Sequence, residues 1–196
     1  MAVAESEQDP TLLLDAHYAL GCTLFGMGDF AASSKHAEQG IALYNPQQHR
    51  SLASRQVWVD PGIACFTFRA WSLWYLGYPD QALKKAQETQ VIMRELSYPL
   101  SIAYAQLTVA TVYAVRREGQ AAREWAEALI TLATEHEFAH WLGWGTMSLG
   151  WALAEQGQLE EGIARLKEGL ATFRATGSGV YTSHYLALLG LCCINH

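Results

Sequence analysis

The stretch GQLEEGIARLKEGLATF, from Gly157 to Phe173, recurs in altered form three more times along the chain. The other copies are GDFAASSKHAEQGIALY (28–44), GYPDQALKKAQETQVIM (77–93) and REGQAAREWAEALITLA (117–133). Three of the four open with a glycine suited to a tight turn, and the third copy along the chain has Arg117 there instead. Each continues as an apolar stripe of helical period. The pattern predicts four amphipathic helices that begin at turns.

A second apolar helix is predicted before each copy, in LLLDAHYALGCTLF, IACFTFRAWSLWYL, AYAQLTVATVYAV and WGTMSLGWALA. The turn positions between the two helices of each pair are 28, 77, 117 and 157, and they are separated by 49, 40 and 40 residues. Small residues recur at matching points of both helices, where they let two helix axes approach closely. They are Gly21, Ala70, Ala110 and Gly150 in the first helices and Ser33, Ala82, Ala122 and Gly162 in the second. We expect an all-α fold of antiparallel helix pairs, stacked as a solenoid.

Helix caps and prolines agree with this division. Asp29 and Asp60 can cap helix starts, Pro61 and Pro79 suit a first helical position, and Pro46 and Pro99 follow helix ends. The longer first interval falls in the polar stretch 45–62, which we expect to be a loop or a short helical insertion. The predicted organisation is a flexible tail over 1–10 and a repeat domain over 11–196, with units at 11–46, 61–97, 99–136 and 138–176 and a final helix at 179–194.

These residues resemble the tetratricopeptide repeat family. The resemblance is carried by Leu20-Gly21, Gly28-Asp29-Phe30 and Pro46 in the first unit, and by Leu149-Gly150, Gly157 and Gly169 in the fourth. His17 stands where the family has an aromatic residue, and the interval of 40 exceeds the family's repeat of about 34. The resemblance implies a right-handed solenoid of about four and a half units. Phrases such as LWYLGYPDQAL and GWALAEQGQLEEGI look like the repeat region of large bacterial signalling proteins, either ATPase and cyclase proteins or transcription regulators.

Composition narrows the possible functions. With 51% hydrophobic and 16% charged residues in a chain of 196, we expect a folded protein with a sizeable core. A net charge of -6 without a basic cluster argues against nucleic-acid binding. There is no secretory signal and no stretch that predicts a membrane span, so we expect a cytoplasmic protein whose four cysteines are reduced.

The segment HEFAH, from His136 to His140, matches the zinc-peptidase pattern in which two histidines on one helical face bind the metal. The repeat phase places it across the joint between two helices, predicted to end near Glu135 and to restart near Phe138. We therefore expect a protein without catalytic residues, a bound metal or a cofactor. A zinc metallopeptidase is the alternative. The favoured interpretation is an exposed turn, with His136 near a helix C-terminus.

A binding surface is predicted on the first helices, which line the concave side of such a stack. The family's spacing places mostly aromatic residues there, and large aromatics contribute much of the energy at interfaces. The candidate ligand-contacting residues are Tyr18, Phe25, Trp71, Trp74, Tyr75, Tyr104, Trp144, Met147 and Trp151, with Cys22, Leu107 and Thr111 beside them. An aromatic stripe of helical period is also typical of a packed core, so both interpretations stay open.

Two further features bear on partners. Arg69 lies in the apolar run FTFRAW, where it binds an acidic group of a partner, pairs with a nearby glutamate or extends its charged end to the surface. The last segment, YTSHYLALLGLCCINH, predicts one more helix without a second to pair with, which suggests self-association or a longer array.

We therefore expect a non-catalytic scaffold for a protein or peptide segment, serving as the regulatory or sensor module of a larger protein. A module that only builds an oligomer is the remaining alternative.

Overall fold

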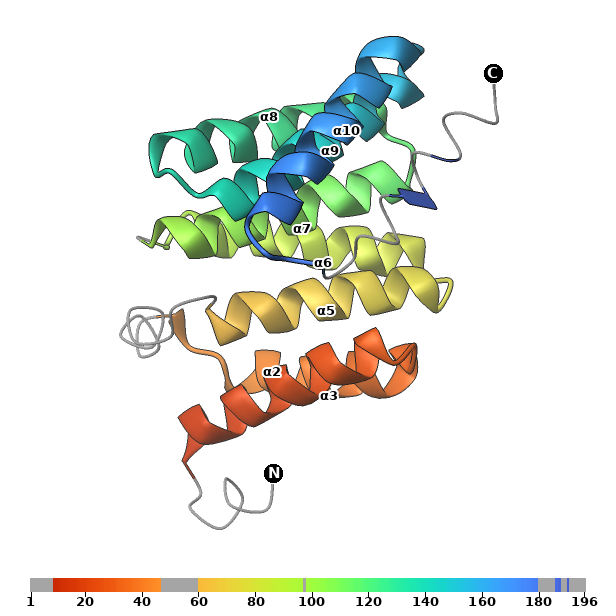
Figure 1. Cartoon of the computed structure of the whole chain (residues 1–196). Helices are drawn as coiled ribbons and strands as arrows, with labels where there is room; N and C mark the ends of the chain where they lie inside the picture. Colours follow the sequence, from red (N-terminus) through yellow and green to blue (C-terminus); the bar gives the residue numbers. More distant parts are fainter. Residues whose placement is uncertain (1–8, 47–59, 97, 180–185, 188–189, 191–196) are drawn as a thin grey trace. The chain divides into compact units, whose positions relative to one another are not determined.

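The computed structural model describes residues 9–46, 60–96, 98–179, 186, 187 and 190. In this part of the chain all regular structure is helical, which confirms the predicted all-α class (Figure 1). The helices are α2 (Pro10–Gly26), α3 (Phe30–Leu43), α5 (Pro61–Tyr75), α6 (Pro79–Met93), α7 (Pro99–Val115), α8 (Gly119–Glu135), α9 (Ala139–Glu155) and α10 (Leu159–Ala175). Most of the tail predicted over 1–10, of the insertion in 45–62 and of the final helix at 179–194 lies outside the described residues. The same holds for self-association through that end, which stays a prediction.

The chain forms two compact units, Met1–Thr108 and Val109–His196, with the division inside α7. In the first unit α5 packs against α2, α3 and α6. Its sequence PGIACFTFRAWSLWY is apolar nearly all round, as expected of a helix with neighbours on several sides, and most of it is buried. Two hydroxyl groups of α5 form buried hydrogen bonds: the Thr67 hydroxyl donates to the Ile63 carbonyl, and the Ser72 hydroxyl donates to the Ser33 hydroxyl at 3.1 Å. α5 is therefore the centre of the first unit's core.

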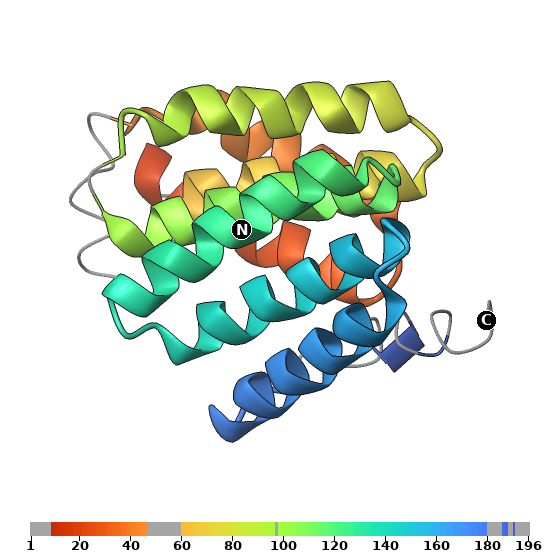
Figure 2. The same ribbon diagram turned by 90° about the horizontal axis from the view of Figure 1, so that it is seen from above.

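In the second unit α9 is the buried central helix, packed against α8 and α10 (Figure 2). Glycines allow α9 and α10 to approach backbone to backbone. A Cβ added at Gly150 would lie 2.6 Å from the Leu166 nitrogen, and one added at Gly169 would lie 2.6 Å from the Met147 nitrogen. Such distances leave no room for a side chain, so this helix pair depends on its glycines.

The turn within each helix pair has one geometry. After α2, α5, α7 and α9 a residue in the left-handed conformation ends the helix, and the next N–H bonds back to the carbonyl five residues earlier, as in a Schellman motif. The φ angles are 82° at Gly28, 84° at Gly77, 60° at Arg117 and 83° at Gly157. These are the four turn positions predicted from the repeat. The turn between α8 and α9 has the same geometry, with Glu137 at φ 56°.

Arg117 is strained in this position, which leads to a prediction. A residue with a Cβ in the left-handed region costs about 1 kcal/mol relative to glycine. We expect Arg117→Gly to raise the free energy of unfolding by about 0.5 kcal/mol, because relief of strain exceeds the added freedom of the unfolded chain. Urea denaturation followed by circular dichroism measures the change. Arg117→Ala is the matched control and should give no gain, and equal gains in both variants would contradict this explanation.

None of the helices in the described part of the chain is long and apolar enough to span a membrane.

Candidate functional site

The predicted binding residues divide by exposure. Six are buried: Phe25, Trp71, Tyr104, Trp144, Met147 and Trp151 have relative exposures of 9% or less. Tyr18 and Trp74 are partly exposed, and Tyr75 is 50% exposed. A partner that meets the surface as it stands can reach Tyr18, Trp74 and Tyr75, and binding by the six buried side chains stays a prediction.

The aromatic residues of the first unit form a cluster centred on Phe25. Its ring lies 5.5 Å from Phe68, 5.9 Å from Trp71 and 5.8 Å from Tyr75, between ring centroids. Phe30, the first residue of α3, lies 5.3 Å from Phe25. The cluster ties together α2, α3 and α5 at the end where the α2–α3 and α5–α6 turns lie, on the right of Figure 1.

The outer side of this cluster is an exposed apolar surface. Phe30 stacks on Tyr75 with a centroid distance of 4.5 Å and an interplanar angle of 12°. In the turn that precedes Phe30 and the turn that follows Tyr75, Met27 is 76% exposed, Leu76 38% and Tyr78 51%. We call these five residues the unit-1 patch. Large exposed apolar side chains gathered on adjoining turns are typical of an interaction site.

Sequence reasoning found only Tyr75 among the five residues of the unit-1 patch. The other four lie in turns or at a helix start, in the segments MGDF and LGYP, where the repeat pattern was used only to locate turns. The available signal was the presence of large apolar residues at connections, which are usually polar. That signal distinguishes these two turns from the connections EQGQ and REG later in the chain.

The aromatic residues of the second unit pack within the protein. The indole N–H of Trp151 donates to the Ala114 carbonyl at 3.3 Å, which joins α9 to α7. Trp144 lies edge-on to Phe173 of α10 at 5.5 Å and donates its N–H to His140 Nε2 at 3.2 Å. Within this unit these rings are part of the core.

HEFAH lies across a turn, as the repeat phase predicts. His136 is the residue after α8, Glu137 has the left-handed φ of 56°, and His140 is the second residue of α9. The two histidines are thus not one turn apart on a continuous helix, which is the arrangement that zinc peptidases of this pattern require. In the described residues no group of three or more His, Cys, Asp or Glu side chains could hold a metal ion.

His140 makes stability depend on pH. Burial lowers the pKa of its imidazole from the ordinary value of 6.5, and its Nε2 accepts the Trp144 hydrogen bond only when it carries no proton. The unfolded chain therefore binds this proton more readily than the folded chain, so the stabilisation present above pH 6.5 is lost as the pH falls towards the folded pKa. We expect urea denaturation to show a smaller loss on acidification for His140→Gln than for the unchanged chain. Equal losses would contradict this assignment.

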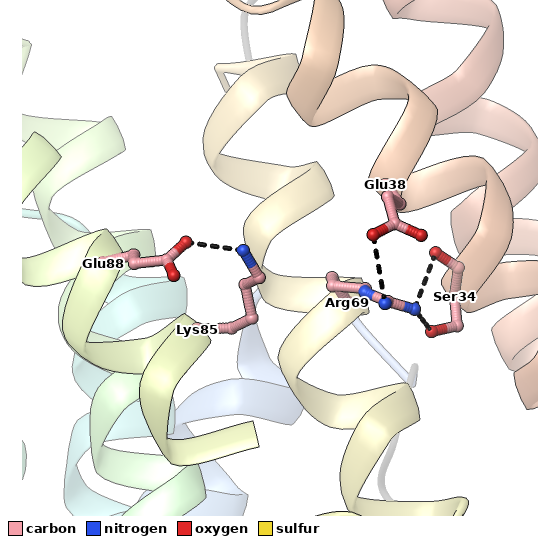
Figure 3. A network of polar contacts seen from close by, with 5 residues as sticks. All are labelled: Ser34, Glu38, Arg69, Lys85 and Glu88. Carbon is pink, nitrogen blue, oxygen red and sulfur yellow. Dashed lines mark hydrogen bonds and ion pairs between the residues drawn. The ribbon is translucent and has the colours of Figure 1, made fainter. Parts of the chain in front are cut away.

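Arg69 pairs with a nearby glutamate, which is one of the three interpretations given for this charge. From α5 it reaches α3, where Nη2 lies 3.3 Å from Glu38 Oε1 and Nη1 donates to the Ser34 hydroxyl (Figure 3). On α6, Lys85 pairs with Glu88 at 2.6 Å. Arg69 is therefore occupied in joining α3 to α5.

Among the described cysteines, Cys22 and Cys65 are free thiols. Burial, with smaller contributions from Asp60 and Asp15, raises the pKa of the Cys65 thiol to about 12. The thiolate is the reactive form, so Cys65 is a core residue rather than a nucleophile. Cys192 and Cys193 lie outside the described residues.

No protein-family model matches the chain, and no curated protein matches it.

Proposed function

We propose that this chain is a non-catalytic scaffold that binds a peptide segment of a partner protein on the unit-1 patch. The observation that carries the proposal is the stack of Phe30 on half-exposed Tyr75, with exposed Met27, Leu76 and Tyr78 in the turns next to these two residues in the sequence. A single exposed apolar residue needs no explanation, whereas four of them at two adjoining turns, with partly exposed Phe30 between, are a recognisable interaction surface.

The chemistry of the patch suits recognition of a peptide. Aromatic side chains have few rotatable bonds, so a contact with them loses little conformational entropy. Here the stack with Phe30 already holds the Tyr75 ring in place. The buried Phe25 ring also packs against Tyr75, with a centroid distance of 5.8 Å. Such a preorganised aromatic surface binds apolar or aromatic side chains of a segment laid across it.

The scaffold itself is proposed to be a right-handed, tetratricopeptide-like solenoid. In the first unit α5 packs against both helices of the preceding pair, α2 and α3. In the second unit α9 packs against α8 and is joined to α7 through Trp151. This recurrence, with the shared turn geometry, supports stacked helix pairs. A role as a cytoplasmic regulatory or sensor module of a bacterial signalling protein rests on the sequence resemblance alone.

Peptide selection with matched variants tests the proposal. Short peptides would be selected from a displayed random library on the intact chain, and their affinities measured by isothermal titration. We expect Tyr75→Ala to weaken the selected peptides by at least about tenfold, the effect of removing an interface hot spot. Val91→Ala is the control, because Val91 is 60% exposed near the far end of α6. Equal affinities for both variants, or no selectable peptide, would rule out the unit-1 patch.

A further inference from the structure

The two tyrosines of the unit-1 patch present hydrogen-bond donors at its surface. Tyr75 ends α5 and Tyr78 directly precedes α6, and each is about half exposed. Within the part of the chain that the structure describes, neither hydroxyl forms a hydrogen bond to another residue. Three residues of chain span at most about 11 Å, so one short segment can meet both tyrosines. The patch therefore combines flat rings with two hydroxyl groups that can donate to a partner.

The other side chains of the patch are apolar. Met27, Phe30 and Leu76 carry no side-chain N–H or O–H group, and the thioether of Met27 is only a weak acceptor. A donor of the partner that is buried against them would lose its bonds to water without finding an acceptor, which is costly. The patch therefore favours a segment that is rich in acceptors and poor in donors.

The charge beside the patch is negative. The two turns, 26–30 and 75–80, contain no Lys or Arg, and Asp29 in the first of them is exposed. Asp29 caps α3, but a helix N-terminus carries only about half an elementary positive charge, so the carboxylate outweighs it. The next lysines, Lys35 and Lys84, lie on α3 and α6 beyond the turns. Charge complementarity thus favours a segment with a basic residue.

Among the common forms of peptide recognition, polyproline II fits this surface. Addition of a strand needs a sheet edge, and the described residues form only helices. Recognition of phosphorylated or acidic segments uses clustered arginines, and the two turns contain none. A helical segment bonds its carbonyls internally, so the tyrosine hydroxyls would find only side chains. A polyproline II segment has no internal hydrogen bonds, which leaves its carbonyls available, and proline has no N–H.

We propose that the segment bound by the unit-1 patch is proline-rich, adopts the polyproline II conformation and carries a Lys or Arg beside its prolines. This inference rests on the proposed function. The proline rings pack on the stack of Phe30 and Tyr75, and the Tyr75 and Tyr78 hydroxyls donate to carbonyls of the segment. One turn of polyproline II is three residues and about 9 Å, within the span between the two tyrosines. The basic residue lies against Asp29.

Peptide selection separates this inference from the proposed function. Ten-residue random peptides, about the length of three polyproline II turns, would be selected on the intact chain, and those that no longer bind Tyr75→Ala retained. We expect proline to be enriched in them at least about threefold over the unselected library, with Lys or Arg near one end. Peptides that depend on Tyr75 without enrichment of proline would overturn the inference and leave the proposed function standing. The lack of any selectable peptide would overturn both.

Two conservative variants test the contacts with a proline-rich peptide from this selection, by fluorescence polarisation. Tyr78→Phe keeps the ring and removes the donor, so we expect affinity to fall by about threefold to tenfold. Asp29→Asn keeps a helix cap and removes the charge, and should weaken binding by about threefold at low salt but not at about 0.5 M salt. Glu160→Gln, at the exposed start of α10, is the charge control and should bind like the unchanged chain. Full affinity in Tyr78→Phe, or equal effects of Asp29→Asn and Glu160→Gln, would overturn the inference.

Discussion

Gly150→Ala is expected to destabilise the second unit by about 3 kcal/mol, the upper part of the range for overpacking a close contact. The added Cβ would lie 2.6 Å from the Leu166 nitrogen and 2.7 Å from the Gly162 carbonyl oxygen. Both are backbone atoms, so no side-chain rotation relieves the clash. The helices must move apart, which opens the packing of α9 on α10.

The matched control is Gly21→Ala, at the position that the repeat makes equivalent. There the nearest atom to an added Cβ is the Ser33 carbonyl oxygen at 3.7 Å, an ordinary contact. Alanine is favoured over glycine inside a helix by about 0.5–1 kcal/mol, so this variant should be slightly stabilised. Urea denaturation of both variants measures the difference. Destabilisation of both to a similar extent would contradict the contact geometry.

Asp60→Ala is expected to cost about 3 kcal/mol, more than removal of an ordinary helix cap, which costs about 1 kcal/mol. Asp60 is 2% exposed, and its Oδ1 accepts hydrogen bonds from the N–H groups of Gly62 at 2.8 Å and Ile63 at 3.1 Å. Its Oδ2 accepts from the Tyr44 hydroxyl at 3.0 Å. Alanine leaves the two buried N–H groups of α5 without this acceptor.

Asp29→Ala is the control for this prediction. Asp29 caps α3 through one exposed bond to the Ala32 nitrogen at 3.0 Å, so its loss should cost only about 1 kcal/mol. Thermal and urea unfolding of both variants provide the comparison. An Asp60→Ala cost no greater than that of Asp29→Ala would show that burial of the cap contributes nothing.

The helices and turns were predictable because they depend on local sequence. Glycine or its substitute ends a helix through its own backbone conformation, so positions 28, 77, 117 and 157 could be identified without knowledge of the fold. The spacing of the repeat also predicted that HEFAH lies across the turn between two helices. The sequence interval of 40 hid a finer structural period: α7, α8, α9 and α10 each have 17 residues and begin at 99, 119, 139 and 159. The sequence did not reveal this period of 20 residues, because the left-handed turn residue between α8 and α9 is Glu137 and not a glycine.

Exposure of the aromatic residues was not predictable in the same way. Helical period states which side chains share a face, but the neighbouring helix decides whether that face is covered. Trp71 and Tyr75 lie one turn apart on α5, yet they are 7% and 50% exposed. Gly21 and Gly150 likewise share a repeat position but differ in how closely their neighbours approach. Such differences depend on tertiary packing, and the residue pattern of one helix does not specify which neighbours pack against it.

The most direct test of the proposed function is NMR mapping of a bound peptide on the intact chain. Spectra of aromatic, methionine-methyl and valine-methyl groups would be recorded during titration with a peptide selected on this protein. The proposal predicts that the largest shifts fall on Met27, Phe30, Tyr75 and Tyr78, with small shifts at Val91. Largest shifts on residues outside the unit-1 patch, or none at saturating peptide, would contradict it.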